Sequence, residues 1–221
     1  MSDGDRRRVL EICIDSMESA VAAVQGGADR LERDTGLVRR IAERWPRLEQ
    51  RSMLRSRDGD FVYSEDELSV MEEDAARLME AGSKGLVFGA LHPNGHLNVE
   101  ACREVKRLAH DPPFTLHRAI DVCPMSSFLI EEDDDLCVIA GVSRLAPDDE
   151  RSSERSLRLR HHPHEGVHVL KEMAALAQHL GVRLMAGSGV SPSTLPALLS
   201  ECGSGHSAIM DWHASASTTV P

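Results

Sequence analysis

Short apolar runs alternate with longer amphipathic segments along most of the chain. The runs are rich in Val, Ile and Leu and only a few residues long, which is typical of strands buried in a parallel sheet. We expect eight such strands, at Val9–Ile14, Ala28–Glu32, Ser52–Arg55, Gly85–Phe88, Phe114–Leu116, Val142–Leu145, Val182–Ala186 and Ala208–Trp212.

The amphipathic segments carry the start signals of helices. Ser16 is a candidate N-cap for a helix that ends near Gly26. Ser64 is a candidate N-cap for a longer helix to Ala81, and Glu67, three residues further on, completes a capping box. Further helices are expected at Leu37–Trp45, Asn98–Ala109, Val167–Leu180 and Ser193–Leu199.

Strands that alternate with helices form a mostly parallel sheet with helices outside, which predicts an α/β protein. Eight strands favour closure into a (β/α)8 barrel, the TIM barrel fold. An open doubly wound sheet is the alternative, although the glycine fingerprint of dinucleotide binding is absent after the first strand. We expect a single domain over residues 9–216, preceded by a disordered tail at residues 1–8.

Two polar segments interrupt the alternation. Residues 131–135 are all acidic and occupy the place of the fifth helix. Residues 147–165 are rich in Arg, Ser and His and almost free of apolar side chains, so we expect a flexible insertion after the sixth strand. Little structure is expected after the eighth strand.

Composition narrows the class of partner. The formal net charge of −11 opposes binding to nucleic acid, and an aromatic content of 3% offers few platforms for stacking bases. We read no signal peptide and no membrane span. The five cysteines are odd in number and widely spaced, which favours reduced thiols in the cytosol. The expected partner is therefore a small molecule or a metal ion, with no nucleic acid and no membrane.

The fifth strand ends in a polar cluster of His117, Arg118 and Asp121. Charged groups are costly to bury without partners, but the carboxyl ends of barrel strands line the ligand site. We therefore take His117 and Asp121 as candidates for acid–base chemistry.

Glu11, in the first strand, and Glu32, at the end of the second, admit three interpretations. They pair with Arg55 or Arg118 as a structural network, they act as catalytic acids or bases or bind a metal, or they are simply exposed. The sequence leaves these three alternatives open.

Other strand ends supply candidate binding groups. A guanidinium matches the two oxygens of a carboxylate or phosphate, and a Gly-Ser-Gly turn can present backbone N–H groups to an anion. The candidates for substrate binding are Arg55, Arg57, Asp60, Arg118, Ser188 and His213.

Several blocks of the sequence, taken in order, resemble the CutC family of copper homeostasis proteins. They are Leu10–Ala20, Gly26–Glu32, Leu54–Ser64, Gly85–Leu91, Phe114–Asp121, Met185–Gly189 and His213–Ala216. The resemblance implies a TIM barrel, a homo-oligomer (dimer or tetramer), a location in the cytoplasm and also the nucleus, and a role in copper handling. It implies no particular enzymatic reaction.

The resemblance also makes Cys13 the candidate metal ligand, since it matches a first-strand cysteine of the family and Cu(I) prefers sulfur donors. Arg33 stands where the family has a second cysteine, and Ala146–Asp148 replaces a Thr-Ser-Gly turn after the sixth strand. The chain therefore resembles a divergent or truncated member. The alternative for Cys13 is that of a small buried side chain.

Two functional hypotheses follow. The first is a copper homeostasis protein that binds Cu(I) in the cytosol. The second is a TIM-barrel enzyme or sensor for a small anionic metabolite, with no copper role. In that case Arg55, Arg57 and Arg118 bind the anion, and His117 or Glu32 transfers a proton.

Overall fold

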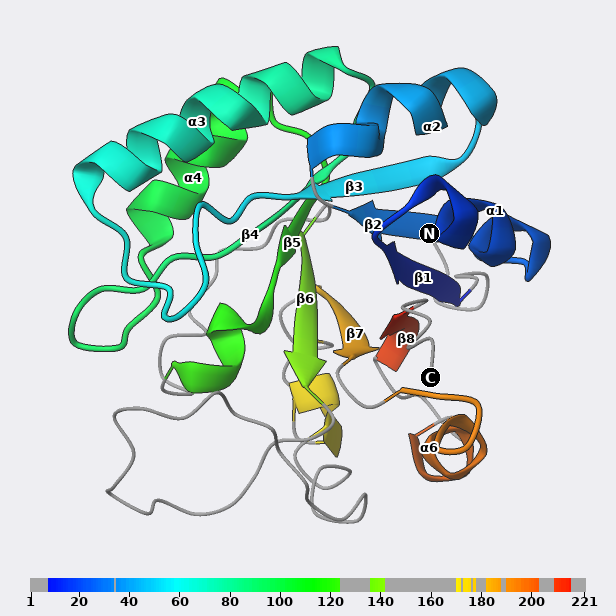
Figure 1. Cartoon of the computed structure of the whole chain (residues 1–221). Coiled ribbons are helices and arrows are strands. Elements are labelled where there is room, and N and C mark those ends of the chain that lie inside the picture. The colour runs from blue at the N-terminus through cyan, green and yellow to red at the C-terminus, as the bar shows by residue number, and fades with distance from the viewer. Residues whose placement is uncertain are drawn as a thin grey trace.

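Eight parallel strands close into a barrel in the computed structural model of the chain (Figure 1). The structure describes residues 8–33, 35–123, 136–141, 170–171, 173–175, 177, 182–187, 190–202 and 209–215. The strands are β1 (Val9–Ile14), β2 (Arg30–Arg33), β3 (Glu49–Met53), β4 (Leu86–Phe88), β5 (Phe114–Leu116), β6 (Leu136–Gly141), β7 (Arg183–Gly187) and β8 (Ile209–Ser215).

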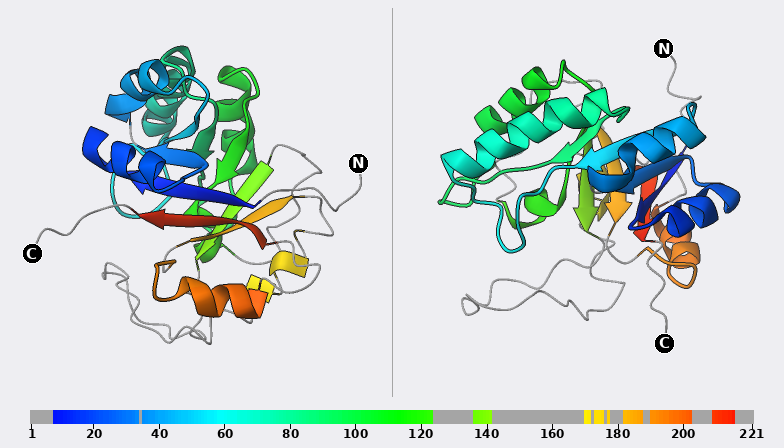
Figure 2. Two further views of the ribbon diagram at one scale, coloured as in Figure 1. Left: turned by 90° about the vertical axis from the view of Figure 1, so that its right-hand side faces the viewer. Right: turned by 45° about the horizontal axis from the view of Figure 1, so that its top comes forward.

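Closure depends on the pairing of the first strand with the last. β1 and β8 run parallel, with Glu11 opposite His213 and Cys13 opposite Ser215. Figure 2 shows the two strands side by side, at opposite ends of the sequence. The TIM barrel predicted from the alternation is therefore confirmed.

Helices cover the outside of the barrel. They are α1 (Met17–Gln25), α2 (Val38–Arg44), α3 (Glu65–Glu80), α4 (Val99–Leu108) and α6 (Leu195–Cys202), with short 3-10 turns η1 (Thr35–Leu37) and η2 (Arg118–Val122). Ser16 and Ser64 both close capping boxes, the second with Glu67 as predicted. The described residues between 170 and 177 are helical, inside the helix predicted for Val167–Leu180.

β3 and β6 differ most from their predicted positions, while the bounds of β2 and β8 are shifted by up to three residues and those of the remaining strands by one at most. β3 begins at Glu49 rather than Ser52, because its charged inward positions form ion pairs in the barrel and so hide the strand pattern. β6 is Leu136–Gly141 rather than Val142–Leu145. This apolar run starts directly after the acidic segment and pairs with both β5 and β7.

Several predicted features lie outside the described residues. They are the tail at residues 1–7, the acidic run at 131–135, the insertion at 147–165 and the chain after residue 215. In the described part of the chain, no helix is long and apolar enough to cross a lipid bilayer.

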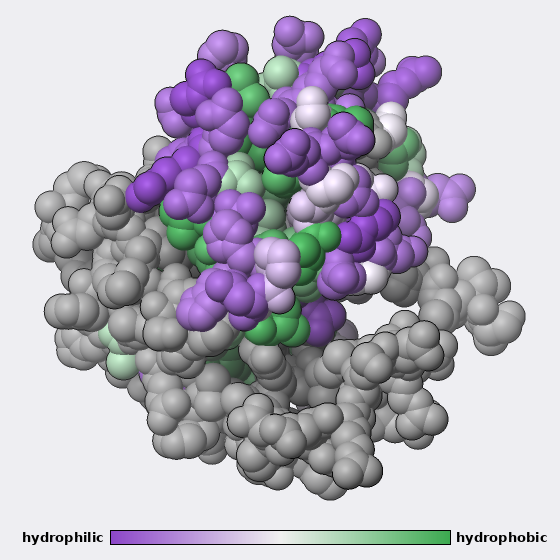
Figure 3. Space-filling model, turned by 90° about the vertical axis from the view of Figure 1, so that its left-hand side faces the viewer, coloured by the Kyte–Doolittle hydropathy of each residue, from purple (hydrophilic) through white to green (hydrophobic). Residues whose placement is uncertain are grey.

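The apolar core lies between the barrel wall and the helices. Leu31 and Ile41 are fully buried beside α1 and α2. Phe88, Met71 and Val105 belong to a larger cluster that joins the barrel to α3 and α4. On the side shown in Figure 3, hydrophilic residues dominate the outer surface, as expected for helices whose apolar faces turn towards the barrel.

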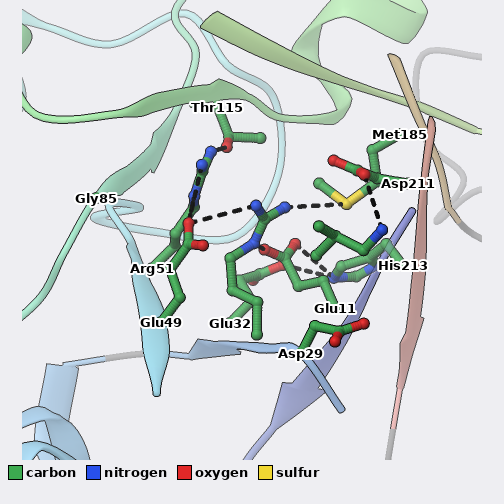
Figure 4. Close-up of polar contacts among 12 residues, drawn as sticks. Glu11, Asp29, Glu32, Glu49, Arg51, Gly85, Thr115, Met185, Asp211 and His213 are labelled. Atoms are coloured by element: carbon green, nitrogen blue, oxygen red, sulfur yellow. Dashed lines mark hydrogen bonds and ion pairs between the residues drawn. The ribbon is translucent and has the colours of Figure 1, made fainter. Parts of the chain in front are cut away.

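Among the described side chains, those inside the barrel are mainly charged, where most TIM barrels pack branched apolar residues (Figure 4). Alternate residues of β1, β2, β3, β7 and β8 supply them. The Nε of Arg30 donates to Glu11, and both side chains are essentially inaccessible to solvent. Glu49 accepts from Arg30 at 3.4 Å and from the Nε of Arg51 at 3.1 Å.

A second ion pair lies between the last two strands. Arg183 donates to Asp211 at 2.6 Å, and the same carboxylate oxygen accepts from the backbone N–H of Val9 at 3.1 Å. Among the residues whose side chains the structure describes, a small apolar cluster of the interior consists of Val87, Met185 and the partly buried Met53. Paired charges therefore replace much of the usual hydrophobic filling.

Removing one partner of the Glu11–Arg30 pair tests this arrangement. We expect Arg30→Met to lower the free energy of unfolding by roughly 3 kcal/mol or more, because Glu11 is left buried without its cation. Adding Glu11→Leu should recover much of that loss. Urea denaturation of the double-mutant cycle measures both effects.

The control is Arg77→Met, which removes an exposed ion pair with Glu73. It should change the free energy of unfolding by less than about 1 kcal/mol. Strictly additive effects of the Arg30 and Glu11 substitutions would show that the two side chains are not coupled.

Candidate functional site

Three potential metal ligands meet near the carboxyl ends of adjacent strands. Cys13 comes from β1, Glu32 from β2 and His213 from β8, and one donor atom from each lies within 4.8 Å of the other two. The Nε2 of His213 contacts Glu32 Oε2 at 2.6 Å, and the thiol of Cys13 lies 3.9 Å from Glu32 Oε1. We call these three residues the β1–β2–β8 cluster.

Strand register brings the cluster together. Cys13 stands directly opposite Glu32 across β1 and β2, while His213 stands opposite Glu11, two residues before Cys13. Residues two apart on a strand point to the same face. The cluster could therefore form only after β8 had closed the barrel against β1.

Glu11 lies beside the cluster and is fully buried. Its Oε2 accepts from Arg30, whereas its Oε1 has no hydrogen-bond partner among the described residues. Oε1 lies 3.9 Å from the Nε2 of His213 (Figure 4). Glu11 therefore presents one oxygen to its buried cation and the other to the cluster.

His213 is held in its charged form. Burial alone lowers the pKa of His213, but hydrogen bonds to Cys13 and Glu32 and the charges of Glu32 and Glu11 raise it to about 10. At neutral pH the imidazolium and the Glu32 carboxylate therefore form an ion pair. A metal ion at this position must displace the histidine proton.

His117 lies on the other side of the barrel, because β5 is separated from β1 by three strands in either direction around the sheet. Its Nδ1 accepts from the backbone N–H of Ala119 at 3.2 Å, and its buried Nε2 has no hydrogen-bond partner among the described residues. Burial, together with the charges of Arg55 and Arg118, lowers the pKa of His117 to about 4. The ring is therefore neutral.

Arg55 is exposed, and the ring of Phe61 contacts both its guanidinium and the ring of His117. Its guanidinium lies over Phe61, 5.0 Å from the centroid, and the Phe61 centroid is 4.8 Å from that of His117. Arg118 contacts Asp121 at 3.4 Å. The predicted cluster of the fifth strand thus gathers with Arg55, apart from Glu11 and Glu32.

Arg57 and Asp60 are engaged within the loop between β3 and α3. Arg57 contacts Glu67 at 2.6 Å, Asp60 at 2.8 Å and the carbonyl of Val62 at 2.7 Å. Beside this loop lies a cavity of about 450 Å³. Its lining is Met53, Leu54, Arg55, Ser56, Arg57, Asp58, Met71 and Asp74.

The observed ion-pair partners of Glu11 and Glu32 differ from those that the sequence suggested. One of the three interpretations of Glu11 and Glu32 paired them with Arg55 or Arg118, but their partners are Arg30 and His213. They are buried, so the interpretation as exposed residues is wrong. Ser188 lies outside the described residues.

Sequence reasoning missed Arg30, Arg51 and Asp211, which are buried inside the barrel together with Glu11 and Glu32. Their signal is the alternation of charged residues within the strands. Arg30 and Glu32 are two apart in β2, as are Asp211 and His213 in β8. Charges at every second position of a barrel strand indicate a polar interior.

The fold and the cluster define an α/β-barrel protein whose candidate ligand site lies near the carboxyl ends of its strands. A sequence model described as the CutC family matches residues 8–217, and the chain belongs to that family.

Relatives of similar sequence agree with this family assignment, and a solved structure agrees with the fold. The copper homeostasis protein cutC homolog of Caenorhabditis elegans is 35% identical to this chain, over 90% of this chain and 78% of the relative. The protein of the same name in Homo sapiens is 32% identical, over 96% of this chain and 74% of the relative. The crystal structure of a CutC protein from Streptococcus agalactiae superposes with a TM-score of 0.72 at 21% identity, covering 94% of this chain and 98% of the other.

A more distant structure supports the fold alone. The deoxyribose phosphate aldolase from Aeropyrum pernix has a TM-score of 0.62 at 12% identity, covering 96% of this chain and 87% of the aldolase. At that identity the likeness concerns the barrel and not the chemistry.

The depressed pKa of His117 predicts a loss of stability in acid. The ordinary pKa of 6.5 falls to about 4 on folding, so between these values the unfolded state binds more protons than the folded state. The free energy of unfolding should therefore fall as the pH drops through this interval, with a contribution from His117 on the order of 3 kcal/mol.

His117→Asn, whose side-chain oxygen can accept from Ala119, should remove this contribution. The exposed His110 has a positive φ of 65° that Asn tolerates, so His110→Asn is the matched control. Denaturant unfolding at a series of pH values measures the difference. Parallel stability curves for the wild type and His117→Asn would contradict the assignment.

Proposed function

We propose that this protein serves copper homeostasis by holding a copper ion at the β1–β2–β8 cluster. The names of its relatives support the copper role, and the meeting of Cys13, Glu32 and His213 supports the site. The cluster is the single observation on which the proposal depends.

The donor set fits a copper ion carried as cargo. Cu(I) accepts thiolate sulfur and imidazole nitrogen, which Cys13 and His213 supply. Glu32 Oε2, which lies 2.6 Å from the Nε2 of His213, is available as a third donor once the histidine proton has been displaced. Cys13 is only partly buried, so the sulfur is within reach of an incoming ion.

The chemistry also bears on location and assembly. A thiol ligand has to stay reduced, so we place the protein in the cytosol. The nuclear location and the dimeric or tetrameric state implied by the family resemblance stay predictions.

Titration with Cu(I) under reducing conditions tests the site. We expect one ion per chain, with the affinity reduced by roughly tenfold or more in Cys13→Ala and in His213→Gln. Competition with a chromophoric Cu(I) chelator measures the affinity. Cys102→Ala, at a buried cysteine in α4, is the matched control and should bind like the wild type.

Two results would exclude the site. They are the absence of stoichiometric Cu(I) binding by the wild type and equal affinities of the wild type and Cys13→Ala.

The second candidate function is an enzyme or sensor for a small anionic metabolite. It is favoured by the cationic side of the barrel, where the charges of Arg55 and Arg118 act on His117 and the Nε2 of His117 has no partner in the described part of the chain. Arg57 is a weaker candidate for anion binding, because its guanidinium is already bonded within the loop.

A thermal-shift screen of phosphate and small carboxylates tests this second function. An anion that binds there should raise the melting temperature of the wild type, and Arg118→Ala should abolish the rise because one cation is lost. Arg103→Ala, on α4, is the control. The absence of stabilisation by any anion would count against this function.

A further inference from the structure

The ring of His117 is held in place by the backbone around it. Its Nδ1 accepts from the backbone N–H of Ala119 at 3.2 Å, at the start of η2. Gly89, directly after β4, leaves room for the ring, because a Cβ atom at position 89 would lie 2.8 Å from Nδ1 and 3.0 Å from Cε1. The backbone N–H of His117 donates to the carbonyl of Phe88 at 3.3 Å. The ends of β4 and β5 therefore fix the orientation of the imidazole.

The contact with Ala119 determines which ring nitrogen carries the proton. A neutral imidazole has one N–H donor and one acceptor nitrogen. The acceptor is Nδ1, because the backbone N–H of Ala119 donates to it. The pKa of about 4 keeps the ring neutral at neutral pH, so the proton lies on Nε2. If Nε2 were a proton acceptor or a metal ligand, Nδ1 would have to carry the proton, in conflict with the N–H of Ala119.

The Nε2–H donor is buried and unused. His117 is 3% exposed, and its Nε2 has no hydrogen-bond partner among the described residues. A buried donor without an acceptor costs free energy, and an acceptor atom of a ligand recovers it. The ring therefore presents one hydrogen-bond donor that the described part of the chain does not satisfy.

The charges near His117 select the kind of acceptor. Arg55 and Arg118 both act on the ring as positive charges. The side chain of Arg118 is half exposed, and Arg55 is exposed. Two guanidiniums beside a neutral N–H donor repel cations and favour the oxygen of an anion.

We propose that His117 recognises a small oxyanion, a carboxylate or a phosphate, by donating from Nε2 to one of its oxygens beside Arg55 and Arg118. The inference rests on the second candidate function above. It gives His117 the role of a hydrogen-bond donor in that function, in place of the proton transfer that the sequence suggested. It involves neither copper nor the β1–β2–β8 cluster.

Access to Nε2 requires one side chain to move. Among the described residues, the rings of Phe61 and Phe88 lie beside His117, with centroids 4.8 and 6.4 Å away. Phe88 is fully buried in the core, whereas Phe61 is partly buried and belongs to the loop between β3 and α3. Phe61 is therefore the ring that the ligand displaces. Since the guanidinium of Arg55 lies over Phe61, the same movement uncovers one face of that guanidinium.

Two substitutions separate the roles of the ring nitrogens. His117→Gln places an amide N–H near the position of Nε2, whereas His117→Asn keeps an acceptor for Ala119 and lacks the donor. We expect the affinity for inorganic phosphate or acetate to fall roughly tenfold or more in His117→Asn, and clearly less in His117→Gln. Calorimetric titration with each anion measures the affinity and distinguishes a phosphate from a carboxylate ligand. His110→Asn, at an exposed histidine, is the matched control.

Nitrogen-15 NMR of the protein labelled in its histidine rings tests the position of the proton without any substitution. We expect the ring that stays neutral at about pH 5 to carry its proton on Nε2. Its N–H signal should move when the anion that binds is added. A proton on Nδ1, or an Nε2–H signal that does not respond to a bound anion, would overturn the inference.

The outcomes separate the inference from the function on which it rests. Equal anion affinities of the wild type and His117→Asn, with binding lost in Arg118→Ala, would overturn the role of His117 and leave the anion function standing. The absence of binding by either anion would overturn both.

Discussion

The buried ion pair between Glu11 and Arg30 is the interaction on which both the barrel interior and the candidate site depend. A carboxylate with no exposed surface is stable in this position because a guanidinium is bonded to it. Arg30 also reaches Glu49 at 3.4 Å and the sulfur of Met185 at 3.5 Å, so one cation joins β1 to β3 and β7. Since Arg30 occupies one oxygen of Glu11, the other oxygen is left for His213. The ion pair inside the barrel thus leaves one oxygen of Glu11 facing the β1–β2–β8 cluster near the carboxyl ends of the strands.

Two histidines show how the charge is divided between the sides of the barrel. His213 is surrounded by Glu32 and Glu11, and its pKa rises to about 10 in spite of burial. His117 is buried beside Arg55 and Arg118, and its pKa falls to about 4. For His213 the neighbouring negative charges outweigh burial and raise the pKa, whereas for His117 the neighbouring positive charges add to the effect of burial and lower it. One side of the barrel is therefore suited to a cation and the other to an anion.

The fold could be predicted from the sequence because alternation and helix caps are local signals. Ser16 and Ser64 cap the helices expected of them, and the strands with apolar runs lie at or near their expected positions except β6, which precedes the range expected for it. The start of β3 differs from the prediction because Glu49 and Arg51 are paired with each other in the barrel wall, which no hydrophobic pattern reveals. The individual site residues were recognisable as polar groups on barrel strands, but their partners were not. The contact of His213 with Glu32 spans 181 positions of sequence and exists only after closure of the barrel.

Anomalous diffraction from crystals of the reduced protein loaded with copper shows most directly whether the ion binds at the β1–β2–β8 cluster. We expect a single copper peak between β1, β2 and β8, within bonding distance of Cys13 and His213. A fully occupied peak at another position, with density for the His213–Glu32 contact unchanged, would contradict it.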